Sequence, residues 1–307
     1  MDITLKRIPK LILAQFYMRN PMTHRLIART NQPRLDRPVF ILGVPRSGTS
    51  VFCNRFGAHR DLAHWSEAPT VWDPRHRDPK ADHRWTEKES TPSTIRRINN
   101  NFAFYTRLKG KSRFVNKHPR NSLRVPFLVE GWPDCFLIHV ERDPRAVTNS
   151  LIHEVERERW RQRLPLGSFA RPPGWREFDR AATPVERFSR MVVATYETLL
   201  DDLDSLDLRD RVFTVRYEEF ATDCRSTLRA AFEHCELPID EGAIEAAPER
   251  LENRNYKWLE KRTRDEVEIM RDILTPLLIR MRYETDSNWL ERLRAEREEN
   301  PTSVTAT

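Results

Sequence analysis

Glycine and cysteine are both scarce in this chain. Only eight glycines occur among the 307 residues, and two of them lie in one eight-residue stretch. The four cysteines form no CxxC pair and no Cys/His spacing typical of zinc sites. Cys53 and Cys135 lie in apolar surroundings, as buried free thiols usually do. We therefore expect no metal site and a reducing, cytoplasmic compartment.

The N-terminal stretch MDITLKRIPKLILAQFYMRNP is basic and amphipathic, but its apolar run is too short to span a bilayer. It also lacks the small-residue cleavage site of a signal peptide. We expect residues 1–37 to form a helical extension packed on the domain, and the alternative is peripheral membrane contact through this helix. The net charge of +7 favours anionic ligands, but no signature of a nucleic-acid-binding protein accompanies it.

Apolar runs alternate with helical patterns along the chain. Pro38–Leu42 and Cys135–Val140 are typical of strands buried on both faces of a parallel sheet, and Phe114–Val115 and Val212–Val215 predict shorter strands. The predicted helices are Thr49–Ala58, Ser93–Leu108, Asn121–Val129, one from Pro144, Pro184–Asp202, and two or three before Arg294. This alternation predicts an α/β fold: a three-layer, P-loop-like fold with a central parallel sheet flanked by helices.

Residues 38–294 are expected to form one domain, followed by a disordered tail over 295–307. Within the domain, residues 62–92 and 157–184 are expected to be long loops. In a parallel sheet, ligands bind beyond the carboxyl ends of the strands. The segments GVPRSGTS, NKHPR, ERDPR and RYEEF all follow predicted strands, so the sequence predicts one site at that edge.

The stretch GVPRSGTS, residues 43–50, matches the Walker A spacing but has Thr49 where that motif has lysine. Gly48 allows the backbone to approach a ligand closely. The N–H groups at the helix start form an anion cradle, to which Thr49 and Ser50 add hydroxyl groups. Arg46 adds a forked cation that can bind two oxygens. The loop therefore predicts an anion site.

This strand–loop–helix unit resembles the 5′-phosphosulfate loop of sulfotransferases that use 3′-phosphoadenosine 5′-phosphosulfate (PAPS). The string GVPRSGT is similar to that of the branch that includes the tyrosylprotein sulfotransferases. The resemblance implies that PAPS is the sulfuryl donor and leaves as 3′-phosphoadenosine 5′-phosphate (PAP). It also implies that the 5′ end is bound by Arg46, Ser47, Gly48, Thr49 and Ser50.

The second nucleotide element of this family is an arginine after a strand and a serine eight residues later, which bind the 3′-phosphate. CFLIHVERDPRAVTNSL supplies Arg142 and Ser150 at this spacing. Two weaker similarities imply nucleotide contacts for Tyr217, in VFTVRYEEF, and Lys257, in NYKW. The sequence departs from the tyrosylprotein branch at Glu154, where that branch has a second arginine.

Sulfuryl transfer requires a base for the acceptor hydroxyl and cations at the leaving oxygens. Arg46 and Lys117 are the candidate cations, the latter because NKHP resembles the N-K-D-P segment of the tyrosylprotein branch. That resemblance implies Glu67 as the base. Cytosolic small-molecule sulfotransferases use a histidine shortly after a lysine instead, so His118 is the second candidate and His64 the third.

The sequence thus predicts a sulfotransferase acting, without a metal, on a hydroxyl or amine of a carbohydrate, lipid or phenolic small molecule. A P-loop kinase or NTPase is the alternative, and it would need a lysine at position 49 and an acidic Mg²⁺ partner. A non-catalytic nucleotide- or glycan-binding module is a third hypothesis. It would keep both phosphate loops but would need neither Glu67 nor Lys117.

Overall fold

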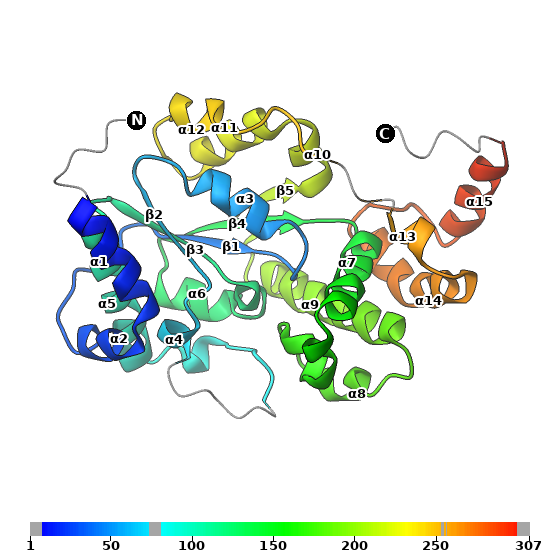
Figure 1. The fold of residues 1–307 in the computed structure, drawn as a ribbon, viewed down its shortest axis with the longest axis horizontal. Helices are drawn as coiled ribbons and strands as arrows, with labels where there is room; N and C mark the ends of the chain where they lie inside the picture. The colour runs from blue at the N-terminus through cyan, green and yellow to red at the C-terminus, as the bar shows by residue number, and fades with distance from the viewer. Residues whose placement is uncertain (1–7, 74–80, 253–254, 256, 300–307) are drawn as a thin grey trace.

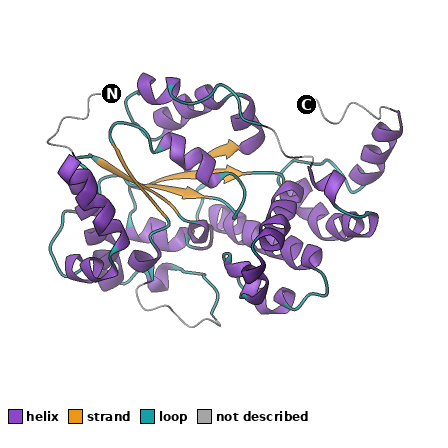
Figure 2. Ribbon diagram, viewed as in Figure 1, coloured by secondary structure: helices purple, strands orange, loops and turns teal. Residues whose placement is uncertain are grey.

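The computed structural model describes residues 8–73, 81–252, 255 and 257–299. Its centre is a five-stranded sheet in the order β2-β3-β1-β4-β5, with every neighbouring pair parallel. The strands are β1 (Val39–Leu42), β2 (Leu62–Ser66), β3 (Arg113–Lys117), β4 (Phe136–Glu141) and β5 (Val212–Arg216). Helices flank the sheet on both sides (Figures 1 and 2), which confirms the predicted α/β, P-loop-like fold.

The helices fall into three groups around the sheet (Figure 1). One face carries α3 (Thr49–Phe56), α10 (Tyr217–Thr222), α11 (Cys224–His234) and α12 (Glu241–Glu245). The other carries α4 (Pro69–Trp72), α5 (Pro92–Leu108), α6 (Val125–Gly131) and part of α9 (Pro184–Ser205). A third cluster joins α7 (Pro144–Arg157), α8 (Trp175–Asp179), α9, α13 (Lys257–Lys261), α14 (Arg264–Arg280) and α15 (Trp289–Glu299). Short 3-10 turns are η1 (Glu87–Glu89), η2 (Pro119–Leu123), η3 (Arg159–Arg163), η4 (Pro165–Ser168) and η5 (Arg209–Arg211).

Strand β1 lies at the centre of the sheet and is buried on both faces. Val39 and Ile41 pack into the cluster of α3 and α11, whereas Phe40 and Leu42 pack into the cluster of α5 and α6. Successive side chains of a strand point to opposite faces, so a continuous apolar run fits this position. The packing fixes where β1 ends and therefore where the loop at 43–50 begins.

Strand β2 is the element that sequence reasoning missed, because residues 62–92 are expected to form a loop. The stretch LAHWS instead forms an edge strand that pairs with β3, in register from Leu62↔Arg113 to Ser66↔Lys117. Leu62, Ala63 and Trp65 are buried. The surrounding His, Trp and Pro residues hide the pattern, since a five-residue strand gives a weak periodic signal.

The other differences concern short or terminal elements. Residues 157–184 contain η3, η4 and α8 rather than one structureless loop. After β5, the described part of the chain contains six helices, α10 to α15, more than the two or three expected. Helix α15 extends to Glu299, so 295–299 are helical, and residues 300–307 lie outside the described residues.

The N-terminal segment forms α1 (Ile8–Arg19) and α2 (Pro21–Ile27), which pack against α5. Ala14 and Tyr17 are buried in the core, and the Tyr17 hydroxyl donates to Oδ1 of Asn101 at 2.5 Å. One face of α1 is thus fixed on the domain. Among the described helices, none combines the length and apolar character that a bilayer crossing needs.

Candidate active site

The loop GVPRSGTS leaves β1 and begins α3, with Gly48 as the N-cap at φ +93°. A Cβ on Gly48 would lie 2.3 Å from Cδ2 of Tyr217, so only glycine fits against this ring. The first N–H groups of α3 have no intrahelical acceptor. The Ser47 Oγ has no hydrogen-bond partner within the described chain, but it is fully buried. The donors that the loop can present to an anion are therefore the N–H groups at the start of α3.

We expect Gly48→Ala to lower the free energy of unfolding by about 1–3 kcal/mol and to weaken PAP binding at least about tenfold, because the new methyl displaces the Tyr217 ring. The matched control is Gly110→Ala, at φ +62° with no atom within 4 Å of the new Cβ. This control variant introduces the strain of a positive φ without a steric clash, so it should leave PAP affinity unchanged. Calorimetric titration and urea unfolding check both variants, and an unaltered PAP affinity in Gly48→Ala would contradict the role of this contact.

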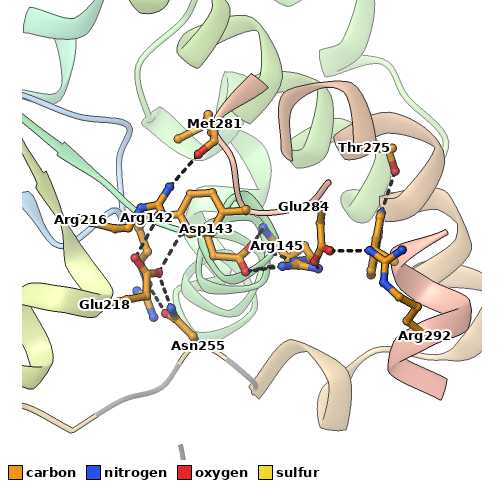
Figure 3. A network of polar contacts seen from close by, with 12 residues as sticks. Arg142, Asp143, Arg145, Arg216, Glu218, Asn255, Thr275, Met281, Glu284 and Arg292 are labelled. Atoms are coloured by element: carbon orange, nitrogen blue, oxygen red, sulfur yellow. Dashed lines mark hydrogen bonds and ion pairs between the residues drawn. The ribbon is translucent and has the colours of Figure 1, made fainter. Parts of the chain in front are cut away.

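Arg142 directly follows β4 and is held on three sides (Figure 3). Its Nε donates to Oδ1 of Asn255 at 2.8 Å, and its Nη1 donates to the backbone oxygen of Arg46 at 3.3 Å. The guanidinium carbon lies 4.5 Å from the centre of the Tyr217 ring. The Asn255 amide in turn donates to Glu218. These contacts fix the guanidinium plane and leave its Nη2 without a partner in the described structure.

A second ionic network fixes the start of α7 beside Arg142 (Figure 3). Arg145 donates to both carboxylate oxygens of Asp143 and, at 2.6 Å, to Oε1 of Glu284. The backbone N–H of Asp143 donates to Glu218 at 3.1 Å. Arg142 therefore stands on a rigid strand-to-helix turn.

The two predicted nucleotide loops are in direct contact through Arg46. Its Nε donates to Oγ of Ser150 at 3.1 Å, and its Nη2 lies 3.8 Å from Oε2 of Glu154. Arg46 adopts φ +76°, a left-handed backbone conformation that is strained for a residue other than glycine. Glu154, the position that departs from the tyrosylprotein branch, also lies 3.0 Å from Nη2 of Arg157. The acid thus neutralises arginines at this edge.

Glu67 and Lys117 form an ion pair at the ends of neighbouring strands. The register Ser66↔Lys117 places Glu67 beside the end of β3. Lys117 Nζ donates to Oε1 of Glu67 at 2.9 Å, and the Glu67 N–H donates to the Lys117 carbonyl at 2.6 Å. The Lys117 side chain is 4% exposed, whereas that of Glu67 is 52% exposed. The carboxylate is therefore accessible to a substrate while its cationic partner is buried.

The two candidate histidines have different surroundings from Glu67. His118 Nδ1 accepts the Arg120 backbone N–H at 3.2 Å, and Nε2 is buried without a partner among the residues described. Burial, and then Arg124, Arg120 and Lys117, lower the pKa of His118 well below its ordinary value. His64 Nε2 lies 3.1 Å from Cys53 Sγ, and burial lowers its pKa to about 4. Both rings are therefore held neutral.

Two cavities adjoin at the loop GVPRSGTS. A cavity of about 360 Å³ is lined by residues that include Glu67, Lys117, His118, Arg120, Glu154 and Arg161. A cavity of about 490 Å³ is lined by residues that include Gly48, Arg142, Ser150, Tyr217, Glu252 and Lys257. Arg46, Thr49 and Ser50 line both. His64 is not among the residues that line either cavity, although all the other predicted residues except buried Ser47 do so.

The structure adds residues that sequence reasoning missed. Asn255 orients Arg142, although only Lys257 was singled out in the NYKW segment; Lys257 itself lies 3.5 Å from Glu252. Ser122 Oγ accepts the Gly43 N–H at 2.7 Å and so supports the loop from η2. Neither hydrogen bond can be predicted from the sequence alone, because each joins segments that are far apart in the chain. Within the described residues, no group of three or more His, Cys, Asp or Glu side chains could hold a metal ion.

The family model of the sulfotransferase family matches residues 38–241. The chain therefore belongs to the sulfotransferase family, a family of transferases. No curated protein sequence matches it.

The chain is similar to three solved structures of sulfotransferases. The sulfotransferase STF9 from Mycobacterium avium has a TM-score of 0.52 at 15% identity, covering 86% of this chain and 80% of that one. A sulfotransferase from Alicyclobacillus acidocaldarius has a TM-score of 0.48 at 18% identity, covering 79% and 93%. Mouse sulfotransferase SULT7A1, complexed with PAP, has a TM-score of 0.48 at 13% identity, covering 86% and 91%.

Proposed function

We propose that this sulfotransferase uses PAPS to sulfate a hydroxyl or amine of a small-molecule, glycan or lipid acceptor. The observation that carries this proposal is the pair of adjoining cavities. One is lined by both nucleotide loops and the other by Glu67 and Lys117, and Arg46, Thr49 and Ser50 line both. A group held by these three residues would face a nucleotide on one side and an acceptor on the other.

The larger cavity fits the donor nucleotide. The N-terminal turn of α3, where Thr49 and Ser50 line the cavity, suits the 5′ phosphosulfate. Arg142 and Ser150 suit the 3′-phosphate, since the fork of Arg142 is fixed while its Nη2 is available. Tyr217 and Lys257 also line this cavity. No metal is needed to bind this nucleotide, because arginine and backbone N–H groups supply the positive charge.

The smaller cavity fits the transfer step. PAPS supplies the sulfuryl group, which forms a bond to the acceptor oxygen as its bond to the 5′-phosphate oxygen breaks. Glu67, exposed to the cavity, accepts the acceptor proton. Lys117 holds this carboxylate at 2.9 Å and, with Arg46, places positive charge where the leaving phosphate gains negative charge.

Glu67 is favoured over the histidines as the base. The Nδ1 lone pair of His118 already accepts the Arg120 N–H, so its neutral ring carries the proton on the buried Nε2. A ring in this state has no free lone pair for the acceptor proton. Glu67, Lys117 and Arg46 follow the pattern of the tyrosylprotein-like branch, whereas Glu154 departs from it.

A comparison of nucleotides tests the function against the kinase or NTPase alternative. We expect PAP to bind with at least about a hundredfold higher affinity than ATP–Mg²⁺ by calorimetry, because Thr49 replaces the Walker lysine and Arg142 serves a 3′-phosphate. Tighter binding of ATP–Mg²⁺ would overturn the proposal. Labelled PAPS with a broad acceptor panel, analysed by mass spectrometry, then identifies the acceptor. Tight PAP binding without any transfer would favour a non-catalytic binding module.

A further inference from the structure

The excess positive charge of this chain is concentrated at its N-terminus. Residues 3–35 contain seven of the 53 Lys and Arg residues and no Asp or Glu. The other 46 basic residues are matched in number by all 46 acidic residues. The net charge of +7 therefore equals the charge of residues 3–35, which include α1 and α2, and the remainder of the protein is neutral overall.

Three arginines of this segment are exposed and unpaired within the part of the chain that the structure describes. Arg19, Arg25 and Arg29 are exposed, and none of the three guanidinium groups forms an ion pair or hydrogen bond with the described residues. Elsewhere in the described structure, exposed arginines form ion pairs with acids, as in Arg209–Asp204 and Arg292–Asp286. The charge on α1 and α2 is therefore available to an external anionic partner.

Large apolar side chains are exposed on the same two helices. Five of the nine that are exposed in the described part of the chain lie between positions 12 and 26; they are Ile12, Leu13, Phe16, Met22 and Leu26. On α1, Ile12, Phe16 and Arg19 recur at helical spacing, opposite the buried Ala14 and Tyr17. Met22 and Leu26 recur in the same way on α2, next to Arg25. Each helix thus presents apolar groups flanked by unpaired arginines.

We propose that the exposed face of α1 and α2 binds the surface of a bilayer that contains anionic lipids. Apolar side chains at helical spacing enter the acyl boundary, and arginines beside them bind lipid phosphates and carboxylates. A nucleic acid would use the arginines but not five exposed apolar side chains, and a partner copy of this chain would carry the same positive charge. The buried side of α1 and α2 would then pack on the domain while the exposed side contacts a membrane. The two alternatives that the sequence suggests for this segment are therefore compatible.

This surface lies away from the nucleotide cavity, whereas α2 packs against α4, which begins two residues after Glu67. In Figure 1, α1 and α2 are on the left of the molecule, and α7 and α13, which line the nucleotide cavity, are on the right. Binding a membrane through α1 and α2 would therefore leave that cavity open to solvent. The proposal is independent of the donor and acceptor assigned above.

Cosedimentation of the full chain with vesicles tests this proposal. We expect binding to vesicles of phosphatidylcholine with phosphatidylserine, little binding to phosphatidylcholine alone, and release by high salt. Replacing Arg19, Arg25 and Arg29 together by Gln should weaken binding about a hundredfold, at about fivefold per arginine. Phe16→Gln with Leu26→Gln should also weaken it. The matched control Ile279→Gln, which changes an exposed apolar residue of α14, should not.

Several outcomes would overturn the proposal. They are absence of binding to the phosphatidylserine vesicles, equal binding to both vesicle types, or arginine variants that bind as well as the parent. A concentration-dependent dimer that Phe16→Gln with Leu26→Gln abolishes would assign the surface to a second copy instead. PAP affinity, measured by calorimetry, should be the same in all these variants, which shows that each is folded.

Discussion

Glu67→Gln should lower kcat by about a thousandfold while PAP affinity changes little, because general-base catalysis contributes roughly 10²–10⁴ in rate. Glutamine keeps the shape of the side chain and an oxygen that accepts the Lys117 hydrogen bond, so the local structure is retained. What is lost is the ability to take a proton. Steady-state kinetics with the acceptor found by mass spectrometry measures kcat, and calorimetric titration measures PAP affinity.

The rival base supplies the control for this experiment. His118→Gln retains an acceptor for the Arg120 N–H and should lower kcat by less than about tenfold, since the native ring has no available lone pair. The reverse pattern, with Glu67→Gln active and His118→Gln inactive but still able to bind PAP, would assign the base to His118.

Arg142→Gln should raise the Kd of PAP by about a hundredfold, equivalent to about 3 kcal/mol, because hydrogen bonds to charged groups contribute about 1.5–3 kcal/mol each. Glutamine can still donate to Asn255, which limits changes elsewhere in the network. The measurement is calorimetric titration with PAP and with adenosine 5′-phosphate, which lacks the 3′-phosphate.

The second nucleotide makes the test specific to the 3′-phosphate. Adenosine 5′-phosphate should bind the parent and Arg142→Gln with equal affinity, since the contact that differs is absent from this ligand. If the substitution weakens both nucleotides to the same extent, Arg142 supports the shape of the cavity and does not contact the 3′-phosphate.

The sequence predicts those parts of the fold and site that depend on local pattern. Strand β1, the loop at 43–50 and the turn after β4 are each encoded by a continuous run of residues, and the sheet order brings their ends together. Strand β2 was missed because its five residues lie in a stretch rich in His, Trp and Pro. As a result, Glu67 was expected within a loop, whereas it directly follows a strand and is fixed by its pairing with Lys117.

Contacts between distant segments could not be predicted in this way. Asn255 and Arg142 are 113 positions apart, and their hydrogen bond depends on how α13 packs against α7. The unequal distribution of charge, in contrast, can be read from the sequence, since counting the charged side chains of residues 3–35 reveals it directly. The total of +7 alone suggested anionic ligands without showing where the charge lies. The position of the charge points to α1 and α2.

The hydrogen bond from Arg46 to Ser150 has a consequence for how the nucleotide is recognised. The Ser150 hydroxyl oxygen accepts a hydrogen bond from Arg46 and can still donate its own O–H to an anion. The guanidinium polarises this hydroxyl and so strengthens the hydrogen bond to the anion. The sites for the two ends of the nucleotide then share one polarised hydrogen-bond chain. Free-energy losses from Arg46→Gln and Ser150→Ala should therefore not add, and the double variant should lose less affinity than the sum of the two. Such non-additivity would mean that the binding free energy of the intact donor is cooperative, and is not the sum of separate contributions from its phosphate groups.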